Sequence, residues 1–349
     1  MSRPSATGRV PVVTLTGHLG AGKTTLLNHL LQQPGARVGV IVNDFGDVNV
    51  DAGLVTGQID EPASIAGGCL CCLPDAGGLD DALEKLTHPR LGLDVVLVEA
   101  SGIADPLTLA RMIRFSGVER VRPGGVVDVV DAVEHFGTVD DGGDAPARYA
   151  VTSLVVVNKT DRLPAGEGER TLARIEARVH ERNPAAQVVR TSYGRVDPAL
   201  VYDAASVEDP PDQLPLAALL RDGREHDHEH ADAVTVTTAG PVGPGRLVDL
   251  LEEPPAGAYR MKGRVVVDTG RSLRGYVVNV VGRSVHVTSR RVDPAAGGGG
   301  ADGAGELVAI GMHLDVGHVR DRLERALAPS AHPDAQGFAR LQRYRRLSR

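Results

Sequence analysis

All three cysteines of the 349-residue chain, Cys69, Cys71 and Cys72, lie within four positions of one another. Thiolates are soft ligands that suit Zn²⁺, Cu⁺ and related ions, and three around one ion leave a coordination position open for release. An extended strand would point Cys72 away from the other two, so a shared ion requires a local turn, which the flanking glycines and proline permit. The pattern indicates a transition-metal site. A reduced, unligated cluster or a redox pair is the alternative.

A glycine-rich run upstream of the cysteines fits a phosphate-binding loop. Residues 17–24 read GHLGAGKT, which matches G-x-x-x-x-G-K-[ST] between an apolar run and a helical pattern. We expect the Lys23 ammonium to neutralise the β- and γ-phosphates and the Thr24 hydroxyl to ligate Mg²⁺, with loop N–H groups facing the phosphates. A glycine-rich turn that only caps a helix is the alternative. The expected nucleotide contacts here are Gly17, Gly20, Ala21, Gly22, Lys23, Thr24 and Thr25.

The run NKTD at 158–161 indicates which base is bound. It follows the apolar run 154–157, and the Asp161 carboxylate can accept both N–H donors of guanine while it repels the acceptor pattern of adenine. Thr191 and Ser192 follow the next apolar run, in the position of the loop that closes over the base in GTPases. A surface turn is the alternative. The expected base-side contacts are Asn158, Lys159, Asp161 and Ser192.

Two further loops carry carboxylates that could act near the γ-phosphate. Glu99 ends the apolar run 95–98, and Gly102 follows with an N–H that could sense the γ-phosphate. We expect Glu99 to act through Mg²⁺ or its water shell, or to orient the attacking water, although it could instead cap the next turn. Asp44 and Asp47 follow an earlier apolar run and are candidates for Mg²⁺ binding and water positioning. The candidate catalytic residues are Lys23, Glu99 and Asp47, and the candidate Mg²⁺ ligands are Thr24, Asp44 and Glu99.

A short histidine run marks a second, weaker metal candidate. Residues 225–230 read EHDHEH, and the imidazoles at alternate positions, His226, His228 and His230, can capture a divalent ion. A solvated charged linker is the alternative, because three histidines without fixed geometry bind weakly. The isolated histidines interpreted as structural or surface residues are His18, His29 and His88.

The elements that must position these residues alternate between apolar runs and helical patterns from Val12 to Ser192. This alternation predicts an α/β fold with a mostly parallel sheet covered by helices. The expected strands are 12–16, 38–42, 95–98, 126–130, 154–157 and 187–190. The residues expected on the buried face of the helix after the phosphate loop are Leu26, Leu27, Leu30 and Leu31.

From residue 233 the pattern changes to a smaller α+β unit. It is expected to begin with a strand at residue 233, followed by strands 265–268, 276–280, 285–288 and 306–310, and its expected helices are 245–253 and 316–327. The expected organisation is a P-loop domain at 1–205, a charged linker at 206–232, an α+β domain at 233–329 and an Arg-rich, poorly ordered tail at 330–349.

The bulk composition excludes several classes of protein. A net charge of −7 and a pI near 5.9 lack the basic excess that nucleic-acid binding usually requires, so nucleic acid is not an expected partner. No apolar run reaches the roughly 18 residues of a membrane span, and residues 1–9 are polar, so neither an anchor nor a secretory signal is expected. We expect a cytoplasmic protein with reduced thiols. Whether several copies of the chain assemble into a homo-oligomer is left open.

Taken together, the motifs resemble CobW-like P-loop GTPases, the GTP-dependent zinc or cobalt metallochaperones. The segments that carry the resemblance are 17–24, 43–51, 67–72, 99–106, 158–161, 260–263 and 307–311, in the family's order. Two positions depart from the family pattern: His18 replaces a common aromatic residue, and Asp44 replaces a glutamate whose longer side chain reaches further. The resemblance covers nearly the whole chain.

The resemblance implies GTP hydrolysis coupled to delivery of a metal to a client metalloprotein. The implied ligands are GTP, Mg²⁺ and Zn²⁺, or Co²⁺ for members tied to cobalamin synthesis. Hydrolysis should be slow without a partner, because the candidate switch segments show no obvious glutamine or arginine finger. Two alternatives stay open: a P-loop kinase or other phosphotransferase, and a non-catalytic metal sensor that uses GTP only as a ligand.

Overall fold

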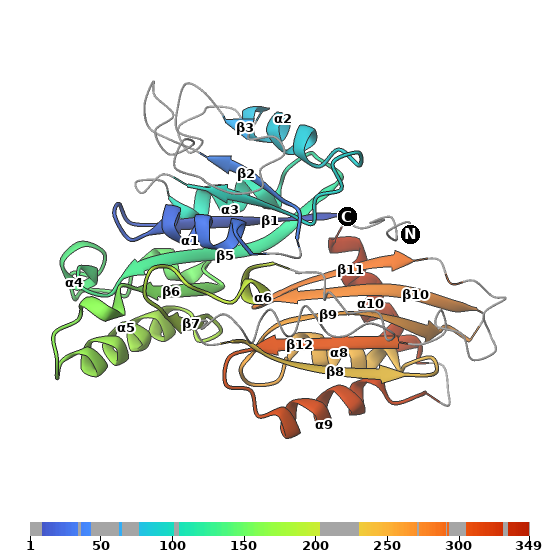
Figure 1. Ribbon diagram of the computed structural model, residues 1–349. Helices are drawn as coiled ribbons and strands as arrows, with labels where there is room; N and C mark the ends of the chain where they lie inside the picture. Colours follow the sequence, from blue (N-terminus) through green and yellow to red (C-terminus); the bar gives the residue numbers. More distant parts are fainter. Residues whose placement is uncertain are drawn as a thin grey trace, which may run out of the picture. The chain divides into compact units, whose positions relative to one another are not determined.

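The computed structural model describes residues 9–33, 36–42, 63–64, 77–100, 105–202, 230–270, 272–290, 292, 305–330 and 334–348. The chain divides into two compact units, Met1–His230 and Ala231–Arg349 (Figure 1). Each unit is built around a β-sheet of its own. The predicted combination of a mostly parallel sheet with a separate α+β unit is confirmed.

In its described part, the first unit contains a seven-stranded sheet in the order β3-β2-β4-β1-β5-β6-β7, with every strand pair parallel. The strands are β1 (Val10–Gly17), β2 (Val38–Val42), β3 (Ala63–Ser64), β4 (Val95–Glu99), β5 (Val121–Asp131), β6 (Leu154–Asn158) and β7 (Gln187–Arg190). Strands β2, β4 and β6 are buried at every position, as expected when helices cover both faces of a parallel sheet. Strand β5 begins earlier than the predicted residue 126 because Val121, Arg122 and Pro123 already pair with β1.

Helices cover the two faces of this sheet. The helices are α1 (Lys23–Leu31), α2 (Gly77–Leu86), α3 (Pro106–Arg114), α4 (His135–Thr138), α5 (Gly168–Arg182) and α6 (Pro198–Val201), with 3₁₀ turns η2 (Ala147–Ala150) and η3 (Thr160–Arg162). One apolar cluster joins α2 and α3 to the face of β1 and β4 that carries Val12 and Val96. A second cluster joins α5 to the same face further along, through Val130 and Val157.

Helix α1 lies over the opposite face. Asn158 follows Val157 in β6, so its side chain points to the other side of the sheet, and its amide contacts Ala21 just before α1. The predicted leucine face is confirmed, since Leu26, Leu27 and Leu30 are at most 1% exposed.

All carboxyl ends of the parallel strands meet at one edge of the sheet, and the predicted nucleotide motifs follow those ends. The phosphate loop follows β1, Glu99 ends β4, Asn158 ends β6, and Ser192 follows β7. Ligands of open α/β sheets bind at this edge. The sheet order therefore gathers at one place four segments that are far apart in the sequence.

The second unit has an antiparallel sheet in the order β11-β10-β9-β12-β8. Its strands are β8 (Asp232–Thr238), β9 (Ala258–Asp268), β10 (Leu273–Val281), β11 (Ser284–Arg290) and β12 (Gly305–Gly311), and its helices are α8 (Pro244–Glu252), α9 (Val316–Leu327) and α10 (Ala335–Leu347). One apolar cluster joins the sheet to the helices, with Leu247, Val265 and Leu323 fully buried. Strand β9 begins earlier than the predicted residue 265 because residues 260–264 pair with both β10 and β12.

The prediction of a poorly ordered tail after residue 330 is wrong, because α10 packs on the second unit. The Asp334 carboxylate caps its first turn by accepting from the Gly337 N–H at 2.8 Å. Leu341 is fully buried, and Arg340 pairs with Asp249 and Glu252 at 2.7 and 2.6 Å. The arginine-rich composition led to the wrong prediction, because the few apolar residues of α10 are enough to pack the helix against the second unit.

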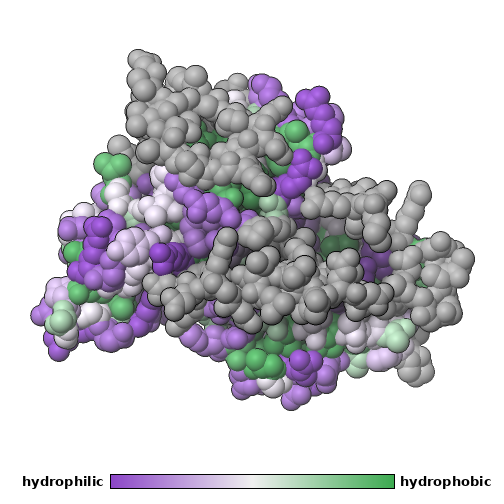
Figure 2. Space-filling view, in the orientation of Figure 1, coloured by the Kyte–Doolittle hydropathy of each residue, from purple (hydrophilic) through white to green (hydrophobic). Residues whose placement is uncertain are grey.

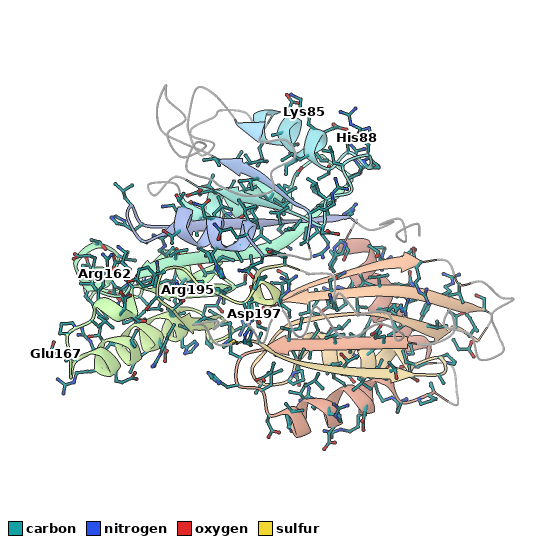
Figure 3. All side chains as sticks on the ribbon, in the orientation of Figure 1. Lys85, His88, Arg162, Glu167, Arg195 and Asp197 are labelled. Atoms are coloured by element: carbon teal, nitrogen blue, oxygen red, sulfur yellow. The ribbon has the colours of Figure 1, made fainter. Side chains whose placement is uncertain are left out.

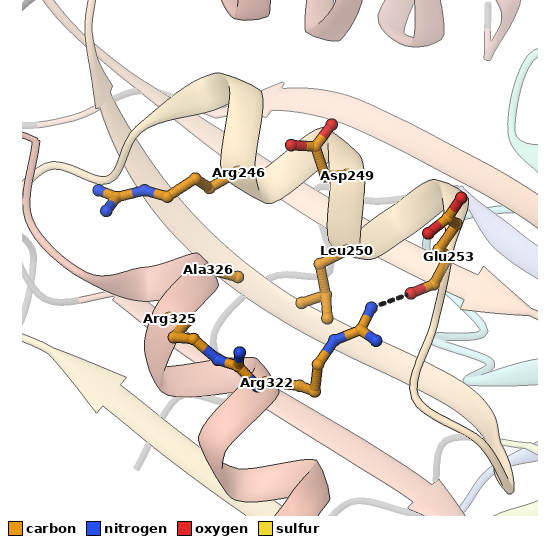
Figure 4. Close-up of a pocket in the computed structure, with 7 residues that line it drawn as sticks. All are labelled: Arg246, Asp249, Leu250, Glu253, Arg322, Arg325 and Ala326. Atoms are coloured by element: carbon orange, nitrogen blue, oxygen red, sulfur yellow. Dashed lines mark hydrogen bonds between the residues drawn. The ribbon is translucent and has the colours of Figure 1, made fainter.

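Helices α8 and α9 hold each other through arginines at their ends. Arg246 of α8 donates to the carbonyl of Ala328, just beyond α9, at 2.6 Å, and Arg322 of α9 donates to the carbonyl of Glu253, just beyond α8, at 2.6 Å. Figure 4 shows the second bond at the shallow groove between the helices. Each guanidinium satisfies carbonyls that a helix C-terminus leaves without a helical partner.

The described surface is mixed in polarity. Figure 2 shows hydrophilic and hydrophobic residues interspersed on the part of this face that the described residues occupy. Within the described ranges, no helix is long and apolar enough to cross a membrane.

Candidate nucleotide site

The loop after β1 has the backbone that a phosphate-binding loop requires. Gly20 and Gly22 take φ of 77° and 106°, in the left-handed region. A Cβ at Gly22 would lie 2.3 Å from Nδ2 of Asn158, so only glycine fits there. Ala21 is fully buried, and its N–H donates to the carbonyl of His18 at 3.1 Å. Helix α1 begins at Lys23, which directs its first N–H groups towards the loop.

Lys23 is held inside this loop. Its Nζ donates to the carbonyls of Gly17 at 3.0 Å and His18 at 3.3 Å, and the residue is 8% exposed. A buried ammonium framed by loop carbonyls lies where a polyphosphate would bring negative charge. The role of Lys23 towards a phosphate stays a prediction.

The two described candidates for Mg²⁺ binding are in contact. The Thr24 hydroxyl donates to Oε1 of Glu99 at 3.2 Å, and Glu99 is 3% exposed. Thr24 comes from α1 and Glu99 from the end of β4, which pairs with β1 directly below the loop. Thr25 is exposed, one residue further along α1. Two oxygen atoms of the kind that ligate Mg²⁺, from separate elements, thus face the same corner of the site.

Asn158 joins the phosphate loop to the loop after β7. Its Nδ2 donates to the carbonyl of Ala21 at 2.9 Å, and its Oδ1 accepts from the N–H of Gly194 at 2.9 Å. The side chain is 2% exposed, so both bonds are shielded from water. The predicted base-side residue therefore also fixes the geometry of both loops.

Ser192 ties the loop after β7 to the rest of the base-side segment. Its Oγ lies 3.0 Å from Oγ1 of Thr160 and accepts from the N–H of Asp161 at 3.2 Å. Asp161 is exposed, so its carboxylate is accessible to a base. The structure thus brings Asn158, Asp161 and Ser192 together, and their contact with a base stays a prediction.

Lys159 takes part in a neighbouring ion pair. It has φ 63°, and its Nζ lies 2.5 Å from Oδ2 of Asp131 at the end of β5. Burial alone would raise the pKa of Asp131, but the bond from Lys159 and two backbone N–H groups outweigh it and hold that pKa below its usual range.

Sequence reasoning missed a buried ion pair beside the phosphate loop. Asp128, fully buried in β5, accepts two bonds from Arg148 of η2, at 2.7 and 2.8 Å. Arg148 also donates to Oγ1 of Thr16, the residue before the loop, at 3.3 Å. Burial raises the pKa of Asp128, and Arg148 opposes that rise. The available signal was a carboxylate inside an otherwise apolar strand.

Several predicted residues lie outside the described ranges. They are Asp44, Asp47, Cys69, Cys71, Cys72, Gly102, His226 and His228. Among the residues that are described, no group of three or more His, Cys, Asp or Glu side chains is placed to hold a metal. His230 lies 3.5 Å from Asp197, on the loop after β7. His29, interpreted as structural, contacts the carbonyl of Val196 at 3.0 Å.

Two family descriptions match the chain in the order of its two units. Residues 11–190 match the nucleotide-binding domain described as CobW/HypB/UreG, and residues 231–327 match the C-terminal domain of the cobalamin synthesis protein CobW. The chain belongs to the CobW/HypB/UreG family. The predicted family resemblance and the predicted enzyme class, a GTPase, are confirmed.

Relatives within the CobW family carry zinc in their names. The zinc chaperone YjiA of Escherichia coli is 34% identical over 56% of this chain and 61% of its own length, so this match leaves more than a third of YjiA outside it. The zinc chaperone CobW of Pseudomonas aeruginosa is 30% identical over 92% of both chains. A solved structure of zinc-bound YjiA GTPase from E. coli is 22% identical, with a TM-score of 0.42 over 92% of this chain and 99% of that one.

Proposed function

We propose that this chain is a GTP-hydrolysing metallochaperone that binds a transition metal through Cys69, Cys71 and Cys72 and delivers it to a client metalloprotein. Zinc is the first candidate for the cargo and cobalt the second. One observation carries the proposal: hydrogen bonds hold together the segments expected to bind a guanine nucleotide, in a chain whose relatives, matched over at least 90% of its length, are named zinc chaperones.

Lys23 would neutralise the phosphates of bound GTP, and the exposed carboxylate of Asp161 would accept the two N–H donors of guanine. Asn158 would keep both sides of the site in register, because it bonds to the phosphate loop and to Gly194 at once. This arrangement supports binding and orientation of GTP.

Mg²⁺ fits the corner formed by Thr24 and Glu99. The ion prefers oxygen ligands, and a hydroxyl and a buried carboxylate from two elements already face each other there. Thr24 would ligate it directly, and Glu99 would act directly or through a bound water. When bound, the ion would neutralise charge that develops on the β- and γ-phosphates during transfer.

The cysteine motif lies in the sequence between the segment 43–51 and the loop that begins at Glu99, the two segments expected to respond to the γ-phosphate. If hydrolysis rearranges both, it changes the thiolate geometry, so GTP and metal should bind cooperatively. Coupling of this kind must be reciprocal. A client protein would receive the metal once hydrolysis weakens the site.

Metal titration in the presence of GTP–Mg²⁺, GDP–Mg²⁺ or no nucleotide tests the proposal. We expect tighter Zn²⁺ or Co²⁺ binding with GTP than with GDP. Cys71→Ala should weaken metal binding and spare GTP binding, whereas Lys23→Ala should abolish GTP binding and leave the metal affinity at its nucleotide-free value. His88→Ala, at an exposed turn, is the matched control for general loss of a metal-binding side chain.

Equal metal affinity in all three nucleotide states would refute the coupling, and unchanged affinity in Cys71→Ala would refute the assigned metal site. Measuring phosphate release from GTP distinguishes a GTPase from a non-catalytic metal sensor that only binds GTP. A sensor predicts no turnover even with metal and client present.

A further inference from the structure

Tyr193 has an unusual backbone. Three non-glycine residues in the described part of the chain have positive φ, Lys159 (63°), Tyr193 (57°) and His313 (53°). The first two lie in the two loops on the base side of the nucleotide site. Left-handed backbone is disfavoured for a bulky aromatic residue, so neighbouring contacts must hold Tyr193 in place.

The holding contacts come from the base-binding segment on both sides of Tyr193. Before it, the Ser192 hydroxyl accepts from the N–H of Asp161 at 3.2 Å. After it, the N–H of Gly194 donates to Oδ1 of Asn158 at 2.9 Å. Because both neighbours are bonded to the same NKTD segment, the backbone of Tyr193 is fixed relative to the residues expected to recognise guanine.

The loop that carries Tyr193 packs against helix α1. A Cβ on Gly194 would lie 2.8 Å from the backbone nitrogen of Leu26 in α1, so the loop already touches the helix. The Thr191 hydroxyl donates to the carbonyl of Arg195 and closes the turn. Figure 3 labels Arg195 on this loop between β7 and α6.

The ring of Tyr193 consequently lies in solvent. The residue is 59% exposed, whereas Tyr149, Tyr202 and Tyr276 are at most 1% exposed. The guanidinium of Arg195 lies 5.7 Å from the ring centroid, near the outer limit for a cation–π contact. The exposed ring of Tyr193 lies one residue from Ser192, an expected base-side contact, and offers a flat apolar face of the kind on which a base stacks.

We propose that Tyr193 stacks on the guanine base of the bound nucleotide and covers it on the solvent side; this rests on the proposed function, since it takes a guanine nucleotide as the ligand. Asp161 then supplies the choice of base through hydrogen bonds, and Tyr193 supplies affinity, because stacking on an aromatic ring suits every base. The contact does not involve the γ-phosphate. GTP and GDP therefore gain equally from it.

A tryptophan reporter tests the stacking directly, because the chain contains no Trp. In Tyr193→Trp, titration with GDP–Mg²⁺ should quench the single indole, with a midpoint that equals the Kd measured by calorimetry. Phe115→Trp is the matched control: Phe115 is 79% exposed and follows α3 towards the start of β5, at the opposite edge of the same sheet. Its emission should stay constant.

Affinity measurements complete the test. Tyr193→Ala should raise the Kd of GTP and GDP by the same factor, about tenfold, which is typical of one base–aromatic stack. Tyr193→Phe should bind like the wild type, because the ring and not the hydroxyl makes the contact. Unchanged Kd in Tyr193→Ala, with GTP bound by the wild type, would overturn the stacking alone. A wild type that binds neither nucleotide would overturn the proposed function as well.

Discussion

The hydroxyl of Thr24 lies 3.2 Å from a carboxylate oxygen of Glu99, although 75 positions separate the two residues in the sequence. The contact exists because β4 pairs with β1, which aligns the end of one strand with the start of the helix that follows the other. Two oxygen atoms that are far apart in the sequence thereby meet at one corner of the candidate nucleotide site.

We predict that Glu99→Gln lowers GTP turnover about a hundredfold at saturating GTP–Mg²⁺, because loss of one preorganised charge at the transferring phosphate costs on that order. The amide can still accept from Thr24, so folding and GTP binding should persist. Phosphate release under single-turnover conditions measures the effect. Glu169→Gln is the control, since Glu169 pairs with Arg190 on the surface; full turnover in Glu99→Gln would remove Glu99 from catalysis.

We predict that Gly22→Ala loses GTP binding and destabilises the protein by about 3 kcal/mol, because strain at positive φ adds to a clash with the buried amide of Asn158. Gly20→Ala is the matched control. Gly20 also has positive φ, but its Cβ would meet nothing within 4 Å, so only about 1 kcal/mol of strain is expected. Urea denaturation compares them, and equal losses would mean that the Asn158 contact is unimportant.

We predict that Arg148→Met destabilises the protein by about 3–5 kcal/mol at neutral pH, because it leaves the buried carboxylate of Asp128 unpaired. Adding Asp128→Asn should recover much of the loss. Since burial already raises the pKa of Asp128, the penalty in the single variant should shrink as the pH falls and the carboxyl is protonated.

Arg190→Met is the control for this pair. Arg190 bonds to Glu169 and Glu176 at the surface, where an ion pair is worth about 0–1 kcal/mol. Similar losses in Arg148→Met and Arg190→Met would show that burial of Asp128 does not govern its energetics.

Stability should also fall as the pH drops from about 6.5 to about 4 because of His135. Burial lowers the pKa of this fully buried imidazole to about 4, so across that window the unfolded chain binds a proton that the folded one does not. The expected loss is about 3 kcal/mol. His135→Gln should flatten this slope in urea denaturation, and His88→Gln, exposed in a turn, should leave it intact. A slope that persists in His135→Gln would assign it to other groups.

Local sequence determined much of this protein. The spacing of glycines, lysine and threonine in residues 17–24 predicts a phosphate loop when a strand precedes it and a helix follows, because its chemistry depends on adjacent backbone groups. The alternation of valine-rich runs with helical patterns likewise predicted the parallel sheet, since burial on both faces requires continuous apolar strands. Composition misled in the tail, where the arginines of α10 lie beside a few apolar residues that bury it.

Tertiary structure alone decided how these segments meet. Nothing local indicates that Asn158 bonds to both Ala21 and Gly194, that Arg148 neutralises Asp128, or that Tyr193 is held with its ring in solvent. The contacts of Asn158 depend on strand order and register, which bring carboxyl ends from across the chain to one edge of the sheet. The sequence determines which chemical groups are present, and the tertiary structure of the sheet determines the distances between them.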